Sequence, residues 1–321
     1  MATYVRILIV GVNGQDGQLI AEHLARLGHR ITGIGRQPRA AEAIANWLEG
    51  YSAMEVGQRS HEYSQLLERV KPSAVFYLAA VHGSSGTQLE DAWEALQTTS
   101  ILGLNHSLEY ARLNEGVRVI NFSSSRVFGR YHDKFLSEGT LRHPDDLYGV
   151  VKNNADGLVN FYHSVHQVKA TSLILFNHES RLRGADFFSK KLVEEIHSLS
   201  NGGRSIHNFM TLDFWKDWGL ADEYMKIIAH GFQRLERPSY IVATGHTIHT
   251  CQLISDICRE IGIDDSAFFG CEKSASRRSS VGAPPPWTAS PAALLEDTGS
   301  APQIWGKEVF LSLLEQMNHE T

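Results

Sequence analysis

Short apolar runs alternate with amphipathic segments through the first half of the chain. Residues 5–10 (VRILIV) form an apolar, β-branched run that is typical of a buried parallel strand. A glycine-rich stretch follows, and residues 19–27 then carry apolar side chains at helical spacing, with Gly28 as the expected C-terminal cap. Further strands are predicted at residues 30–34, 74–80 and 117–122, and a long helix through residues 103–108. This alternation predicts an α/β fold with a doubly wound parallel sheet.

The second half of the chain shows a looser pattern. Helices are predicted at residues 187–199, 222–232, 250–261 and 305–317, a strand at residues 240–243, and an irregular loop at residues 277–291. We expect residues 1–176 to form a dinucleotide-binding domain, and part of the segment 217–247 to pack back into that domain. Residues 177–321 should mainly form a smaller, C-terminal substrate-binding lobe.

Composition narrows the function classes. The 321 residues are 42% apolar and 21% charged, with a net charge of −6. This negative charge argues against a nucleic-acid-binding surface, and any anionic ligand must be bound by a local group of basic residues. Cys251, Cys258 and Cys271 lack metal-ligand spacing, so we expect no metal site and a reducing compartment. Cys251 and Cys258 should share one helix face as small core residues. With no signal-peptide pattern and no apolar run of membrane-spanning length, we expect a soluble, cytoplasmic protein without a membrane partner.

The glycine-rich turn is the first candidate site. A strand, the sequence GVNGQDG and a helix follow one another, which is the context of a Rossmann-type dinucleotide fingerprint. Glycines let the backbone approach a pyrophosphate at the helix N-terminus, whose N–H groups favour anions. The alternative is a tight turn without a ligand. Because ligands of such sheets bind at the carboxyl ends of the strands, the predicted cofactor residues are Gly11, Asn13, Gly14, Gln15, Gly17, Leu78, Ala79 and Ala80.

The end of the second strand bears on the cofactor. NAD enzymes usually have an acidic residue here for the ribose 2′-hydroxyl, whereas this chain reads GRQPR. Arg36 and Arg39 suit a 2′-phosphate, so NADP is predicted, with NAD as the alternative. In the other interpretation both arginines are ordinary solvated loop residues.

Tyr148 and Lys152 form the candidate catalytic pair. They are four residues apart, which places them on one face of a helix. The positive charge of Lys152 is expected to lower the pKa of the Tyr148 phenol, which can then exchange a proton with a substrate oxygen. Ser124 lies where the 117–122 strand ends and can hydrogen-bond the same oxygen. The spacing alone also fits a tyrosine and a lysine that are simply exposed to solvent on a surface helix and have no catalytic role.

Four sequence blocks carry a family resemblance. These blocks are GVNGQDG, LFNHESRLRG, KDWGLADEY and YIVATG, and the second and third are the more specific. Together they resemble the extended short-chain dehydrogenases that act on nucleotide sugars (the NAD-dependent epimerase/dehydratase family), and most closely the GDP-mannose 4,6-dehydratases. The resemblance covers most of the chain and fades after about residue 270.

The resemblance implies roles for individual residues. Ser124, Tyr148 and Lys152 would be catalytic, with Lys152 also anchoring the nicotinamide ribose. On the cofactor side, Asp16 would help to hold the glycine turn, and Arg36 would lie near the 2′-phosphate. A nucleotide-diphosphate sugar would be the substrate, and a homodimer the assembly. The expected substrate-binding residues are His82, Ser84, Ser125, Arg126, Asn177, Lys191, Lys216 and Arg278, with Arg277 as an alternative to Arg278.

One departure from the family changes the expected reaction. The dehydratases carry a glutamate that removes the C5 proton, and Arg126 stands at this position. Arginine stays protonated and cannot act as that base. We therefore expect hydride transfer at the sugar C4, by a 4-ketoreductase or 4-epimerase acting on a GDP-sugar. The alternatives are 4,6-dehydration with a relocated base, for which His82 is a candidate, and a non-catalytic nucleotide-binding paralogue.

Overall fold

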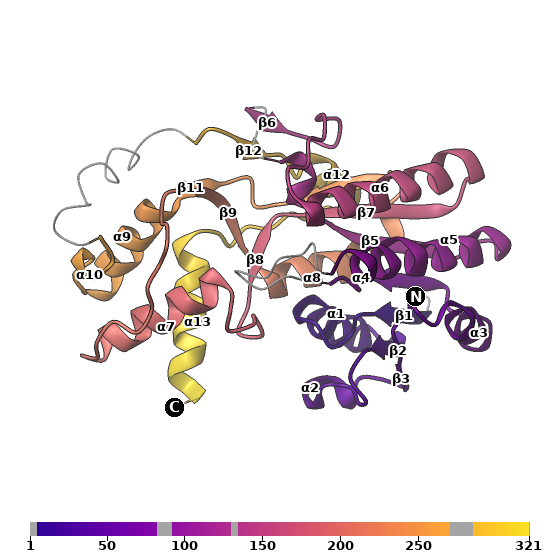
Figure 1. Cartoon of the computed structure of the whole chain (residues 1–321), viewed down its shortest axis with the longest axis horizontal. Coiled ribbons are helices and arrows are strands. Elements are labelled where there is room, and N and C mark those ends of the chain that lie inside the picture. Colours follow the sequence, from indigo (N-terminus) through magenta and orange to yellow (C-terminus); the bar gives the residue numbers. More distant parts are fainter. Residues whose placement is uncertain (1–4, 82–91, 130–133, 270–284, 321) are drawn as a thin grey trace.

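The computed structural model describes residues 5–81, 92–129, 134–269 and 285–320. Its central feature is a seven-stranded sheet with the strand order β10-β7-β5-β4-β1-β2-β3 (Figure 1), in which every neighbouring pair is parallel. This arrangement confirms the predicted doubly wound α/β fold. The strands are β1 (Arg6–Val10), β2 (Arg30–Gly35), β3 (Gly50–Ala53), β4 (Ala74–Tyr77), β5 (Arg118–Ser124), β7 (Lys169–Leu175) and β10 (Ser239–Val242).

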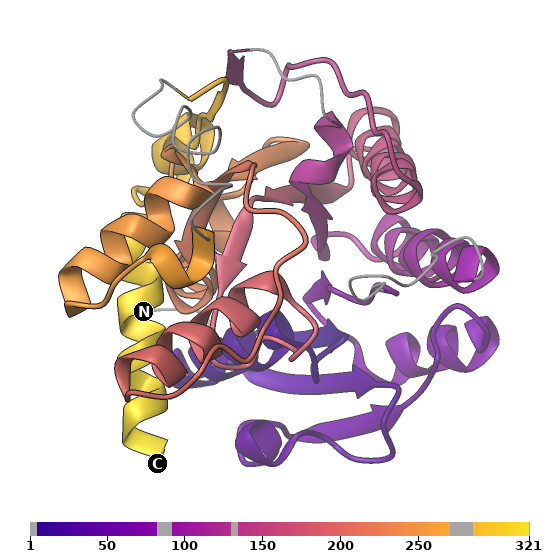
Figure 2. The same ribbon diagram turned by 60° about the vertical axis from the view of Figure 1, so that its left-hand side comes forward.

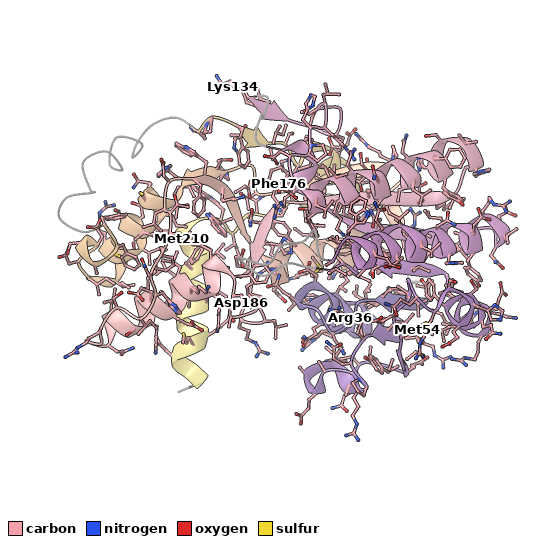
Figure 3. The ribbon with its side chains drawn as sticks, in the orientation of Figure 1. Arg36, Met54, Lys134, Phe176, Asp186 and Met210 are labelled. Carbon is pink, nitrogen blue, oxygen red and sulfur yellow. The ribbon has the colours of Figure 1, made fainter. Side chains whose placement is uncertain are left out.

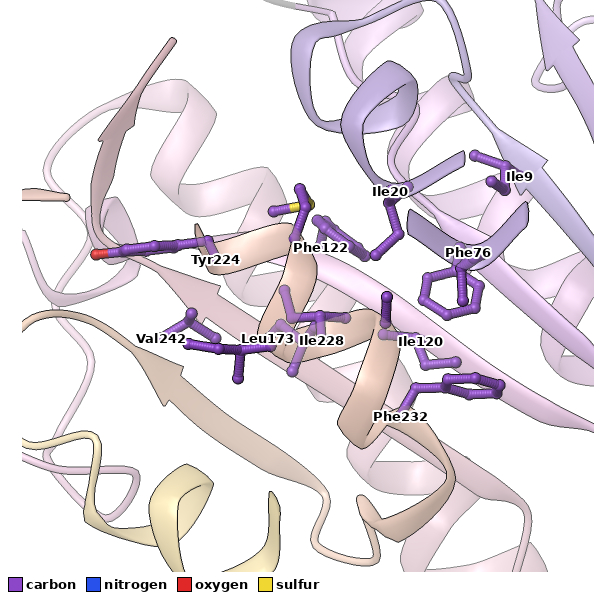
Figure 4. Packing of buried hydrophobic residues seen from close by; sticks show 14 of the residues in the cluster. Ile9, Ile20, Phe76, Ile120, Phe122, Leu173, Tyr224, Ile228, Phe232 and Val242 are labelled. Atoms are coloured by element: carbon purple, nitrogen blue, oxygen red, sulfur yellow. The ribbon is translucent and has the colours of Figure 1, made fainter. Parts of the chain in front are cut away.

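Helices cover both faces of this sheet because successive strand residues point to opposite sides. In β1, Ile7 and Ile9 belong to one buried cluster, whereas Leu8 and Val10 belong to another. The first cluster includes residues of α1 (Gln15–Arg26), α2 (Glu42–Ala45), α8 (Ala221–Gly231) and α12 (Ala292–Thr298). Figure 4 shows it from close by, with Ile20 of α1 and Ile228 of α8 near the strand residues Phe76 and Leu173. The second cluster includes α3 (Ser60–Val70), α5 (Gly103–Leu113) and α6 (Leu147–His166).

The long helix predicted through residues 103–108 is present but not uniform. Helix α4 (Trp93–Gln97) continues into a π-helical turn, η2 (Thr98–Leu102), and then into α5. The Tyr77 hydroxyl donates a hydrogen bond to the carbonyl oxygen of Thr99 inside that turn. A strand side chain thus binds a backbone carbonyl of the widened turn, a contact that helical periodicity does not reveal.

A second group of elements packs around its own apolar cluster. Strands β8 (Asn177–Glu179), β9 (Trp215–Leu220) and β11 (Thr247–His249) form a small mixed sheet. The associated helices are α7 (Phe188–Ser200), α9 (Thr250–Ile261), α10 (Ser266–Phe269) and α13 (Lys307–Glu320). Figure 2 shows this group beside the large sheet. Cys251 and Cys258 of α9 are buried in its cluster as free thiols, which confirms their predicted role as core residues.

The chain passes between the two groups more than once. After β9 it returns to the large sheet through α8, which packs on α1, and through β10, which pairs with β7. Strand β6 (Phe135–Leu136) pairs with β12 (Thr288–Ala289), far away in the sequence. Of the helices in the described part of the chain, none is both long and apolar enough to cross a membrane.

Candidate active site

The glycine turn between β1 and α1 is closely packed. Gly11 has a φ of +93°, and its amide donates to the carbonyl oxygen of Ile34 at 2.8 Å. A Cβ at Gly17 would overlap the carbonyl oxygen of Gly11 and lie 2.7 Å from the Cα of Val12. Helix α1 begins after Gly14 without a side-chain cap. The turn therefore presents backbone and a helix N-terminus at the sheet edge, an arrangement that suits a pyrophosphate.

Two cavities meet at this turn. Strand order reverses between β1 and β4, so their carboxyl ends open a crevice where connections leave in opposite directions. Gly11, Gly14, Leu78 and Ala80 line both the larger cavity, of about 510 Å³, and the smaller one, of about 210 Å³. In Figure 3 Arg36 and Met54, which line the smaller cavity, lie on the side of the large sheet, whereas Asp186 lies with the second group of elements.

The start of α6 sets the position of Tyr148 in the larger cavity. Asp146 is the N-cap of this helix, and its Oδ1 accepts a hydrogen bond from the Gly149 amide at 2.8 Å. A Cβ at Gly149 would lie 2.6 Å from the carbonyl oxygen of Arg126. Only glycine at this position lets the first turn of α6 approach the turn η3 (Ser125–Phe128) so closely. Tyr148 and Ser124 consequently line the same cavity.

Lys152 lies one helical turn after Tyr148 on the same face. Its side chain is 4% exposed, and its Nζ donates to the Phe122 carbonyl oxygen at 2.6 Å. Nζ also lies 5.7 Å from the centre of the Tyr148 ring. Burial lowers the pKa of Lys152 to about 8, although the nearby Asp156 and Asp16 carboxylates act against this shift.

The expected effect of Lys152 on the tyrosine is wrong. Burial raises the pKa of the Tyr148 phenol well above its ordinary value. Among the charges that act on this pKa, the one that lowers it most is Arg126, while Asp16 and Asp146 raise it. At neutral pH the phenol therefore keeps its proton and is suited to donate it.

A buried polar network ties helix α6 to strand β5. Asp156, four residues after Lys152, accepts hydrogen bonds from Asn121 at 3.1 Å, Ser123 at 2.7 Å and Arg142 at 2.7 Å. Asn121 and Ser123 belong to β5, the strand that ends in Ser124. The network thus ties the strand of the serine to the helix of the tyrosine and lysine.

Residues of the NHES block close the cofactor side of the larger cavity. His178 Nε2 lies 3.0 Å from the Asp16 carboxylate, and Ser180 donates to the Gln15 side chain at 2.8 Å. Burial lowers the pKa of His178, but Asp16 raises it by more, so the net pKa is raised. Arg183 also lines the cavity, held by the Glu179 carboxylate at 2.8 Å. Neither His178 nor Arg183 is predicted as a site residue from the sequence.

Most of the predicted site residues meet here, but not all. The larger cavity is lined by Gly11, Gly14, Gln15, Asp16, Gly17, Leu78, Ala80, Ser124, Ser125, Arg126, Tyr148, Lys152, Asn177 and Lys216. Asn13, Arg36 and Ala79 line the smaller cavity, where Glu55 and Val56 are unpredicted neighbours. Lys191, on α7, lines neither of these two cavities. His82, Ser84 and Arg278 lie outside the described residues.

Positive charge dominates the larger cavity. Its described lining includes Arg126, Lys152, Arg183 and Lys216, and one carboxylate, Asp16. Burial lowers the pKa of Lys216, and repulsion from Arg126 lowers it further. Such a lining suits ligands with several negative charges, for example two diphosphates. The described residues contain no cluster of three side chains that could hold a metal ion.

Comparisons with known proteins place these features in context. The sequence profile of a family described as GDP-mannose 4,6 dehydratase matches residues 8–280. GDP-mannose 4,6 dehydratase 2 of Caenorhabditis elegans is 27% identical over 268 residues, which cover 79% of this chain and 70% of the relative. The GDP-mannose 4,6-dehydratase of Vibrio cholerae serotype O1 is 25% identical over 291 residues, 87% of this chain and 78% of the relative.

A solved structure gives the same fold. The Bordetella bronchiseptica enzyme WbmG, in complex with NAD and UDP, aligns with a TM-score of 0.75 at 18% identity, over 99% of this chain and 96% of that one. The sequence matches confirm the resemblance predicted from the NHES and DWG blocks.

Proposed function

Because the chain belongs to the GDP-mannose 4,6 dehydratase family of extended short-chain dehydrogenases, which modify nucleotide sugars, we propose that it transfers hydride at C4 of a nucleotide-diphosphate sugar. The best-supported reaction is that of a 4-ketoreductase or 4-epimerase. The observation that carries this proposal is that Ser124, Tyr148 and Lys152 line one cavity, which opens onto the glycine turn.

Each of the three side chains has a distinct role. Tyr148 donates its proton to the C4 oxygen as the carbonyl is reduced, for which the raised pKa of its phenol is suited. Ser124 hydrogen-bonds the same oxygen and orients it. Lys152 holds the nicotinamide ribose by its Nζ and adds positive charge beside the phenol. A bound nicotinamide cofactor supplies or takes the hydride.

The acidic residues of the cavity argue against dehydration. In the described lining, the one carboxylate is that of Asp16, and it is paired with His178 at 3.0 Å. Burial acts to raise the pKa of Asp16, but the combined effect of His178 and Arg183 is larger, so the net pKa is lowered. A carboxylate that binds protons so weakly is a poor base for a carbon acid. Dehydration with a base from elsewhere remains the second candidate because the named relatives are dehydratases.

NADP is the proposed cofactor. Arg36 follows directly after β2 and lines the smaller cavity, where the adenosine end of a dinucleotide would lie next to the glycine turn. A guanidinium there favours a 2′-phosphate. NAD is the alternative, and the solved WbmG structure contains NAD.

The nucleotide diphosphate of the sugar would contact the second group of elements. Asn177 on β8 and Lys216 on β9 line the larger cavity. Guanine is the proposed base because the named relatives act on a GDP-sugar, and uracil is the alternative. The position of Lys191 outside the cavity gives no support to its expected phosphate contact.

The proposed assembly is a homodimer. Large apolar side chains are exposed along α4, η2 and α6, at Trp93, Leu102, Phe161 and Val165. Two helical segments with such surfaces would bury them against a second copy of the chain.

A substrate panel tests the reaction. A 4-ketoreductase should consume NADPH when given a GDP-4-keto sugar, whereas a dehydratase should convert GDP-mannose to a 4-keto product with no net change in cofactor. Tyr148→Phe should lower kcat by about 10²- to 10⁴-fold because the general acid is lost. Tyr162→Phe makes the same change on the same helix, away from the cavity, and should keep the rate near that of the wild type. Unchanged turnover in Tyr148→Phe would refute the assignment.

A further inference from the structure

Arg126 lies beside the proposed reaction centre. It follows Ser124 by two residues, lines the larger cavity, and its Cζ is 5.8 Å from the centre of the Tyr148 ring. Its side chain is 53% exposed, so the guanidinium can be reached from the cavity. A ligand whose C4 oxygen meets Ser124 and Tyr148 therefore brings its neighbouring substituents towards this guanidinium.

Asp146 holds the guanidinium in place. Its Oδ2 accepts a hydrogen bond from Arg126 Nε at 2.8 Å and forms an ion pair with Nη2 at 2.6 Å, while its Oδ1 caps α6. The carboxylate is thus fixed by the helix that also carries Tyr148. Both contacts go to one carboxylate oxygen. The printed hydrogen bond uses one of the five N–H donors of the guanidinium, so other N–H groups can bind an anionic ligand group.

The geometry of a pyranose indicates which group this is. The diphosphate is attached at C1, across the ring from C4, whereas C6 is attached to C5, the neighbour of C4. An anion close to both C4 and the Tyr148 phenol is therefore a substituent of the sugar rather than the diphosphate. The anionic form of C6 is a carboxylate, whose planar pair of oxygens matches the guanidinium.

We propose that Arg126 binds a carboxylate at C6, so that the substrate is a nucleotide-diphosphate uronic acid or its 4-keto form. This inference rests on the proposed hydride transfer at C4 and names the substrate class of that site. In the 4-keto form, C4 gains a hydride and its oxygen gains a proton; in the uronic acid, C4 and its oxygen lose them. The nicotinamide cofactor would be the hydride donor or acceptor, and the C6 carboxylate is unchanged. Such a substrate has no C6 hydroxyl that could leave, so the site needs no base at C5, and an arginine can stand at that position.

Matched pairs of ligands test the inference. GDP-mannose and GDP-mannuronic acid differ only at C6, as do UDP-glucose and UDP-glucuronic acid. Their dissociation constants would be measured by calorimetry with the NADP-loaded protein. The wild type should bind the uronic acid of at least one pair more tightly. Arg126→Gln should reduce this preference roughly 10- to 100-fold, the effect of losing a charged hydrogen bond. Arg126→Lys keeps the positive charge but loses the paired N–H donors that bind both carboxylate oxygens, so it should give an intermediate preference.

Lys216→Gln is the control for the diphosphate. It should weaken both members of a pair by the same factor and leave the preference unchanged, because both members carry the same diphosphate. Thermal unfolding of each variant shows whether it is folded. A wild type without a preference for the uronic acid, or an Arg126→Gln variant that weakens both sugars and the bare nucleoside diphosphate equally, would overturn the inference. Turnover of neutral sugars alone would leave the proposed function standing, whereas failure of the folded, cofactor-bound protein to bind any nucleotide sugar would overturn both.

Discussion

Replacement of Lys152 by methionine tests the burial on which the active site depends. The Lys152 ammonium lies in a nearly closed environment, and its pKa falls from 10.5 to about 8. Methionine has a similar length without the charge. The lost hydrogen bond to Phe122 and any change in packing are independent of pH, so they shift stability by a constant amount. The pH dependence of the difference between the two proteins therefore reports the lysine alone.

The magnitude follows from the gap between the two pKa values. The folded pKa lies below the unfolded one, so between about pH 8 and 10.5 the unfolded chain binds more protons. The contribution of Lys152 to the free energy of unfolding therefore rises with pH in this window. The full gap is worth about 3 kcal/mol, at about 1.4 kcal/mol per pH unit, and about 2 kcal/mol of it should be gained by pH 9.5.

Urea unfolding followed by tryptophan fluorescence measures this effect at about pH 7 and about pH 9.5. Between these conditions the wild type should gain about 2 kcal/mol relative to Lys152→Met. Lys169→Met, at an exposed position on β7, is the matched control and should show a constant difference from the wild type. If the stability difference between Lys152→Met and the wild type is also the same at both pH values, the ammonium is solvated, and the closed environment of the tyrosine and lysine is refuted.

Two further predictions concern the glycine turn and its ion pair. Gly17→Ala should lower the free energy of unfolding by about 1–3 kcal/mol and weaken cofactor binding, because the added Cβ overlaps backbone atoms. Gly157→Ala in α6 is the control, since the added Cβ has no neighbouring atom within 4 Å. In the same denaturant titration it should raise the free energy of unfolding by about 0.5–1 kcal/mol. Asp16→Asn should destabilise the protein most between about pH 4 and 6.5. The contribution of Asp16 fades as pH falls from its ordinary pKa of 3.8 towards its lowered pKa, and that of His178 fades as pH rises from its ordinary pKa of 6.5 through its raised pKa. A thermal unfolding midpoint that drops equally at pH 5 and pH 9 would contradict the ion-pair account.

Local pattern was sufficient to predict five of the seven strands of the large sheet, but not β3 and β7, and to place Tyr148 and Lys152 on one helix face. The run before Gly11 is apolar and β-branched, and Tyr148 and Lys152 are spaced by one helical turn, so both features follow from short-range geometry. The short strands β8 and β11 have three residues each, too few to show alternation, and were not predicted.

Contacts over long sequence distances could not be predicted in the same way. His178 meets Asp16 across 162 residues, and only the tertiary fold brings them together. Lys190 and Lys191 are adjacent on α7, and sequence does not fix how that helix is rotated; Lys190 lies 3.9 Å from Glu194, and neither lysine lines the larger cavity. The direction of the Tyr148 pKa shift was wrong because it depends on burial, which the spacing of two residues does not give.

The return of the chain to the large sheet has a consequence for fragments of this protein. A polypeptide ending at residue 176 would contain the whole glycine turn and the tyrosine-lysine pair but would lack β10 and α8. The outer edge of β7 would then expose unpaired amide and carbonyl groups, and Ile20 and Leu24 of α1 would lose Met225 and Ile228 as neighbours. Bare strand edges next to apolar surface recruit strands from other molecules. Such a fragment should self-associate into aggregates, so the half of the chain that carries the glycine turn depends on residues that follow β8 and β9 in the sequence.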